Sequence, residues 1–123
     1  MTTWTIRLPY TTPPLSLNSR MHWATKANVT SGLRVGTAIL AVDGRIPPCD
    51  RIRVTLIYVP RDKRTRDRDN LVATLKPCID GLVDAGIVPD DSPEYVTWEP
   101  PIIAAPDPKD PHLRLEITGK EAP

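Results

Sequence analysis

The segment from Arg51 to Val59 constrains the fold most, because apolar side chains alternate there with polar or charged ones. One side carries four apolar residues, namely Ile52, Val54, Leu56 and Tyr58. A period of two is typical of a strand with one buried face, so this segment predicts the principal strand of the chain. Three further strands are expected, at Thr3 to Leu8, Tyr95 to Ile103 and His112 to Thr118.

Two segments have the period of a helix instead. From Ala24 to Val42 the apolar residues recur every three or four positions, and the glycine and prolines that follow end the pattern. A second helix is expected from Asn70 to Ala85, closed by Gly86, with a kink or a shifted register at Pro77.

The resulting order is β-α-β-α-β-β, which predicts an α+β fold with a mixed or mainly antiparallel sheet and two helices. A chain of 123 residues fits a single domain that spans residues 1–123. We expect residues 119–123, at the end of this domain, to be frayed.

Composition argues against several classes of protein. No apolar run of about 18 residues occurs, and the N-terminus lacks the basic start and apolar stretch of a signal peptide. A cytoplasmic protein is therefore expected. Cys49 and Cys78 stand apart, without the spacing of a CxxC or a Cys/His site, which favours buried free thiols over a disulfide or a zinc site.

Charge is unevenly distributed along the chain, although the formal net charge is only +1. Residues 1–70 carry 12 basic and 5 acidic side chains, whereas the remainder carries 4 basic and 10 acidic ones. Such asymmetry is typical of a protein with a basic face for a polyanion and a separate acidic region.

The loop after the principal strand carries the most informative residues. Asp67 and Asp69 stand two apart in a stretch expected to be extended, so both carboxylates would point the same way, and Asp69 would also cap the next helix. Converging carboxylates suit Mg²⁺, with Mn²⁺ as a substitute. The alternative to a metal site is that Asp69 is only a helix N-cap and Asp67 a solvated loop acid. Five bases that favour a phosphate partner crowd this loop, namely Arg61, Lys63, Arg64, Arg66 and Arg68.

Three groups of residues follow one another along the chain in a recognisable order. The first is Pro13-Pro14-Leu15-Ser16-Leu17-Asn18 with Arg20, His22 and Trp23. The second and most specific is Arg66-Asp67-x-Asp69-Asn70-Leu71. The third is Asp80-Gly81-Leu82, Ala85-Gly86 and an Asp90-Asp91 turn, whose acids taken singly are ordinary turn formers. In order and approximate spacing the chain resembles the RusA-type crossover-junction endodeoxyribonucleases over nearly its whole length.

The resemblance implies that Asp67, Asp69 and Asp91 bind Mg²⁺ and act in catalysis. It implies a homodimer that resolves four-way (Holliday) DNA junctions by paired nicks, leaving 5′-phosphate and 3′-hydroxyl ends. Such enzymes serve DNA recombination and repair and are common in phages and prophages. Neither a membrane nor an organic cofactor is expected to take part.

One position departs from the family pattern. The family has a catalytic lysine four residues after the second aspartate, where this chain has Ala73, and Lys76 follows three residues later. Counted back from Asp91, Lys76 falls where the family lysine is expected, which would let Lys76 stabilise charge on the phosphate. The alternative is a solvated helix lysine paired with Asp80.

Seven basic residues are expected to contact backbone phosphates, namely Arg20, Lys26, Arg61, Lys63, Arg64, Arg66 and Arg68. His22 is expected to form a hydrogen bond or to contact phosphate, while Trp23 and Trp98 are expected in the core or an interface. Two other functions stay open. One is a non-cleaving protein that binds branched DNA, which the altered lysine spacing allows; the other is a nuclease that prefers three-way or flap DNA.

The length of the second helix favours a site shared by two chains. A helix from Asn70 to Ala85 would be about 24 Å long, and the chain from Gly86 to Asp91 spans at most about 20 Å. The return of Asp91 to Asp67 and Asp69 of the same chain is therefore expected to be strained. Antiparallel packing in a two-fold dimer would instead bring each Asp91 beside the acidic pair of the other chain.

Overall fold

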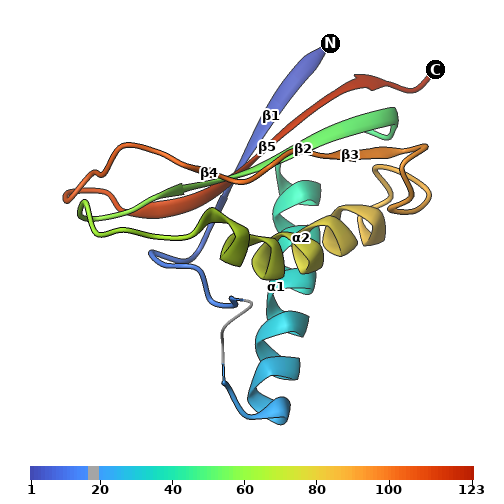
Figure 1. Cartoon of the computed structure of the whole chain (residues 1–123). Helices are drawn as coiled ribbons and strands as arrows, with labels where there is room; N and C mark the ends of the chain where they lie inside the picture. Colours follow the sequence, from blue (N-terminus) through green and yellow to red (C-terminus); the bar gives the residue numbers. More distant parts are fainter. Residues whose placement is uncertain (17–19) are drawn as a thin grey trace.

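Strand β2 (Cys49–Val59) lies inside a five-stranded sheet in the computed structural model of the chain (Figure 1). It pairs antiparallel with β5 (His112–Glu121) and parallel with β3 (Val96–Trp98) and β4 (Ile102–Ile103). Strand β1 (Thr2–Leu8) completes the sheet by antiparallel pairing with β5. The sheet is therefore mixed, and its principal strand is the one predicted from the alternating pattern.

The structure describes residues 1–16 and 20–123, and two helices lie on the same side of the sheet (Figure 1). Helix α1 spans Trp23–Asp43, and helix α2 spans Val72–Asp84 after a 3₁₀ turn, η1, at Arg68–Leu71. The predicted α+β class and the order of its elements are confirmed, and α2 runs through Pro77 without ending there. Residues Leu17 and Asn18 of the proline-rich motif lie outside the described residues.

The core forms where the apolar stripes of both helices meet the sheet. Its largest fully buried side chains include Leu33, Ile52, Leu56, Leu75, Ile79, Leu82, Leu115 and Ile117. Both cysteines are buried free thiols, as expected. Burial raises the pKa of the Cys78 thiol to about 11.

Helix α2 ends as the sequence indicates, at Gly86, which adopts a φ of 80°. The Gly86 N–H donates to the carbonyl of Val83, and the Ile87 N–H donates to the carbonyl of Leu82. These two bonds satisfy carbonyls that the helix leaves open. Ile87 is thereby buried against the core. The following segment is thereby directed back along the molecule.

Two predictions about the C-terminal third need correction. The strand expected from Tyr95 to Ile103 is divided into β3 and β4, because Pro100 and Pro101 between them cannot donate to the ladder. The end of the chain was expected to fray from residue 119, yet β5 continues to Glu121. Gly119 is buried and pairs with both neighbouring strands of β5, which holds this end in the sheet.

The crossing of α1 and α2 yields a stability prediction. A Cβ added at Gly81 would lie 2.4 Å from the Arg34 carbonyl oxygen and 2.9 Å from the Thr37 Cβ, so Gly81→Ala must push the helices apart. We expect a loss of about 1–3 kcal/mol in the free energy of unfolding, measured with urea. The matched control is Gly32→Ala in α1, where nothing lies within 4 Å of the added Cβ. This control should stabilise by about 0.5–1 kcal/mol, and equal effects of the two changes would contradict the packing argument.

Candidate functional site

The acidic pair of the predicted site lies at the start of the second helical segment. Asp67 is extended, with φ −96° and ψ 115°, and its Oδ1 accepts from the Asp69 N–H at 2.9 Å. Asp67 is thus the N-cap, and Asp69 already lies inside the 3₁₀ turn. The expectations that both residues are extended and that Asp69 is the cap are therefore wrong. The pair is exposed, and the Asp69 carboxylate has no hydrogen bond or ion pair within residues 1–16 and 20–123.

The basic residues of the preceding loop are gathered by one acid, Asp62. Its carboxylate accepts from Arg64 at 3.1 Å and from Arg66 at 2.7 Å, and Arg61 lies 3.7 Å away. The hydrogen bonds from Arg66 and Arg64 hold the pKa of Asp62 well below its usual range. Part of the positive charge that the sequence places in this loop is therefore neutralised within the chain.

Arg66 has a structural role in this loop. Its guanidinium donates to the carbonyls of Asp62 and Arg64 at 2.9 Å and lies over the Tyr58 ring, 5.6 Å from the centroid. Only 21% of its side chain is exposed, compared with 70% for Arg64. Arg66 is therefore less accessible to a phosphate than we expected.

The other predicted phosphate contacts are exposed side chains. Lys63 precedes the acidic pair in the loop and Arg68 stands between its two members, while Arg20 and Lys26 lie before and within α1. Among the residues that the structure describes, none of these four cationic groups has a hydrogen bond or ion pair. They are free to bind an external anion.

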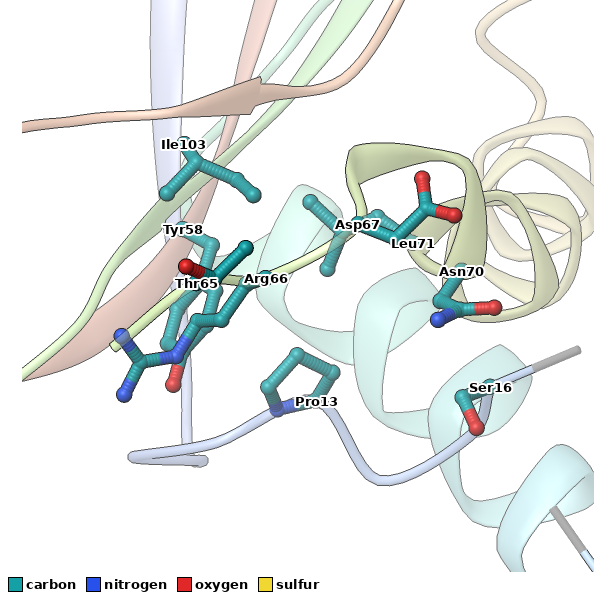
Figure 2. A pocket seen from close by; sticks show the side chains of 9 residues that line it. All are labelled: Pro13, Ser16, Tyr58, Thr65, Arg66, Asp67, Asn70, Leu71 and Ile103. Carbon is teal, nitrogen blue, oxygen red and sulfur yellow. The ribbon is translucent and has the colours of Figure 1, made fainter. Parts of the chain in front are cut away.

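Two cavities lie on either side of the Arg66–Tyr58 pair, which lines both. The first, of about 380 Å³, borders the acidic pair and is shown in Figure 2. Its lining residues are Pro13, Ser16, Tyr58, Thr65, Arg66, Asp67, Asn70, Leu71 and Ile103. The second, of about 490 Å³, is lined by Thr11, Thr12, Tyr58, Arg61, Arg64, Arg66 and Pro111. The second cavity is thus rich in arginine.

Lys76 lies in a separate cluster on α2. Its ammonium donates to Asp80 at 2.8 Å and to Asp91 at 2.5 Å, and lies 5.7 Å from the centre of the Trp98 ring. The predicted pairing with Asp80 is confirmed, while the contacts with Asp91 and Trp98 had no signal in the sequence. Hydrogen bonds to Asp80 and Asp91 raise the pKa of Lys76, and its bond lowers the pKa of Asp91.

The turn after α2 therefore returns to the same helix, but it does not complete the predicted metal site. Asp91 meets Lys76, and Asp67 meets Asp69, and within the described ranges no three acidic, histidine or cysteine side chains form one metal-binding group. Asp67 and Asp69 have the oxygen donors that Mg²⁺ prefers, and one Asp67 oxygen and both Asp69 oxygens are available. The pair suits Mg²⁺ chemically, although it supplies only part of a ligand set.

The structure narrows the alternatives expected for two tryptophans and one histidine. Trp23 is 77% exposed and Trp98 37% exposed, so neither is a core residue. His22 caps α1, because its Nδ1 accepts from the Ala24 N–H at 3.2 Å. Exposed tryptophans beside cationic side chains provide surface for a partner with flat rings.

Comparison with known proteins adds little to this picture. No protein-family model matches the chain. A protein of Xylella fastidiosa, itself named only as uncharacterized, is 27% identical over 85 residues, which cover 65% of this chain and 56% of that protein. The chain thus spans about half the length of the curated relative that it matches. In addition, neither α1 nor α2, the helices of the described chain, is long and apolar enough to cross a bilayer.

The Lys76 cluster makes a prediction for titration. Replacing Lys76 with Met removes the ammonium, so the pKa of Asp91 should rise toward its ordinary value of about 3.9. Because the folded-state pKa of Asp91 is lowered, the pair contributes stability above about pH 4 and loses it as the pH falls. Carboxyl carbon NMR during an acid titration measures the change. The control Lys63→Met should leave the Asp91 titration unchanged, and a wild-type Asp91 that titrates normally would refute the contact.

Proposed function

We propose that this protein is a Mg²⁺-dependent DNA endonuclease of the RusA type that resolves four-way junctions by paired nicks. The observation that carries the proposal is the exposed pair Asp67 and Asp69, which lacks a basic partner although five bases stand within the preceding loop and turn. A divalent cation bound between this pair and a DNA phosphate would relieve the repulsion between the two sets of negative charge.

Each part of the site has a distinct task in this reaction. Mg²⁺, when bound, supplies Lewis acidity toward the phosphodiester, and Mn²⁺ can substitute. Asp67 and Asp69 would hold it, with Asp91 as the third ligand. Lys63, Arg68, Arg20 and Lys26 bind backbone phosphates and so position the duplex without reading its sequence, while Arg61 and Arg64 present a second cationic surface.

Lys76 acts in this scheme mainly through Asp91. Its ammonium is held in the charged form by two carboxylates, and it fixes the position of the Asp91 turn against α2. If Asp91 left this contact, the Lys76 ammonium could instead donate to a phosphate oxygen and stabilise its charge. The protein would act in the cytoplasm, in DNA recombination and repair.

The main alternative is a protein that binds branched DNA without cleaving it. The separation of Asp91 from the other two acids favours this alternative, because no complete ligand set forms within the described part of one chain. A preference for three-way or flap DNA is a variant of the same nuclease chemistry. One assay distinguishes these functions, in which labelled four-way, three-way and duplex DNA are incubated with the protein with and without Mg²⁺.

The acidic pair can be tested in that assay. Asp67→Asn and Asp69→Asn should each abolish cleavage of the four-way junction, by at least about a hundredfold, because each removes a charged ligand. Junction binding should stay equal or become tighter, since a negative charge near phosphate is lost. Gel-shift and nicking assays measure the two effects.

The control for these variants is Asp90→Asn. Asp90 is an exposed acid whose Oδ1 accepts from the Ser92 N–H at 2.8 Å, a bond that the Asn side-chain oxygen can still accept. Cleavage should be unchanged in this control. Weaker binding with normal cleavage in the Asp67 and Asp69 variants would exclude the metal role of the pair.

A second copy of the chain would complete the site. Within one chain the turn after α2 brings Asp91 to Lys76 and does not join it to Asp67 and Asp69. Paired nicks on a four-way junction require two equivalent sites, which a two-fold homodimer supplies. Helix α1 offers exposed apolar side chains for contact between copies, at Val35, Ile39 and Val42.

Complementation tests the shared site. Asp67→Asn and Asp91→Asn chains with different affinity tags are co-expressed, and the heterodimer is purified by both tags. If the acids of two chains meet, one site per heterodimer keeps all three acids, and single-strand nicking returns from the background level of either homodimer. Nicking no greater than that background would show that each site is built within one chain.

A further inference from the structure

The cavity beside Asp67 has the volume of a site for a single ring system. Its volume of about 380 Å³ lies at the lower end of the roughly 300–1,000 Å³ typical of small-molecule sites. This volume exceeds that of one nucleobase and is far too small for a duplex. Figure 2 shows its open centre between Tyr58, Thr65 and Arg66 on one side and Asn70 and Ser16 on the other.

The walls combine flat apolar surface with unused polar groups. Pro13 and Ile103 provide partly exposed apolar surface, whereas Tyr58 and Leu71 lie buried behind it. The side chains of Ser16, Thr65 and Asn70 have no hydrogen-bond partner within the described chain, although each lines the cavity. Asn70 offers two donors and an acceptor, the combination that reads base edges in nucleic-acid complexes.

The cavity is held in shape by bonds outside it. The Thr74 hydroxyl donates to the Leu15 carbonyl at 2.7 Å and accepts from the Leu15 N–H at 3.3 Å. These two bonds fasten the Pro13–Ser16 wall to α2. Arg66 is fixed on Tyr58 by its bonds to Asp62 and to backbone carbonyls. A site preformed in this way loses little conformational entropy when a ligand enters.

We propose that this cavity receives an unpaired base of the DNA strand whose phosphate lies at Asp67 and Asp69, with Asn70 reading the edge of the base. The inference rests on the proposed function and adds a source of base preference to it. The flat face of the base would contact Pro13, Ile103 and the Arg66 guanidinium, because Tyr58 is buried and its ring already lies against Arg66. Unstacked bases are available at a branch point, where pairing is most easily lost.

The test removes the base and fills the cavity in turn. Four-way junctions that carry one abasic nucleotide at successive positions around the branch are titrated with the full chain in metal-free buffer, with fluorescence anisotropy as readout. Wild-type protein should bind about tenfold more weakly when one particular base is absent. In the Thr65→Trp variant the indole would occupy the cavity. This variant should bind the intact junction as weakly as wild type binds the abasic one, and removal of the base should not weaken its binding further.

Two matched variants separate cavity effects from general ones. Thr25→Trp adds the same indole on an exposed position of α1 and should keep the full dependence on the base. Asn70→Ala should reduce differences among the four bases at that position, whereas Asn28→Ala, on α1, should preserve them. Circular dichroism checks that each variant is folded, and Asn70→Ala supplies a result independent of Thr65→Trp.

A cleavage assay with Mg²⁺ on the same junctions separates the two proposals. Wild-type protein that cleaves, but whose affinity changes less than twofold for every abasic position, overturns the base site and leaves the nuclease function standing. Protein that neither binds nor cleaves overturns both. A base dependence in wild type that persists unchanged in Thr65→Trp and Asn70→Ala also overturns the inference, because the base would then be held elsewhere.

Discussion

The burial of the second half of β2 decides where the candidate site of this chain lies. Every residue from Leu56 to Pro60 is buried, on both faces of the sheet. A strand held on both faces and by ladders on both edges cannot shift its register. The charged loop that begins at Arg61 therefore leaves the sheet at a fixed point, and the start of α2 is fixed with it. Asp67, the arginines and both cavities all depend on this anchor.

In that loop, the pairing of the charged side chains determines the surface charge more than the number of basic residues does. The sequence contains five bases between Arg61 and Arg68, which suggests a strongly positive surface. Asp62 engages three arginines, and Arg66 also binds two carbonyls, so this part of the loop is ordered by its own charges. An ordered arginine loses less entropy on meeting a phosphate, but it must share its charge with Asp62. Lys63 and Arg68 differ in both respects: their charges are not shared with an acid, but their side chains are not held in place and lose more entropy when they bind a phosphate.

Local patterns predicted the elements of the fold well, and tertiary contacts account for most of what they missed. The period-two and helical patterns located β1, β2, β5, α1 and α2, because these elements bury one face or stripe against a common core. The contact between Lys76 and Asp91 was not predictable in this way. It depends on the path after Gly86, where the Cys49 N–H donates to the Ile87 carbonyl and the Ile52 N–H donates to the Tyr95 carbonyl. Such bonds join segments far apart in sequence. The misplacement of Asp69 has a local cause, since a 3₁₀ turn begins at Arg68, two residues before the expected helix start at Asn70.

The distribution of ion pairs bears on whether the acids serve cleavage or stability. Asp62, Asp84 and Asp91 each bind a basic side chain, so their charges have a structural use. Asp67 has only its capping bond, a contribution of about 1 kcal/mol that Asn or Ser would supply equally well. A negative charge near a helix start is favourable by itself, but only by about 0.3–1 kcal/mol, and it repels an approaching phosphate. For a protein that merely binds DNA, neutral residues at both positions would combine the cap with tighter binding. Two unpaired carboxylates beside a basic loop are useful chiefly where a cation stands between them and the phosphate, which favours the nuclease over the binding protein.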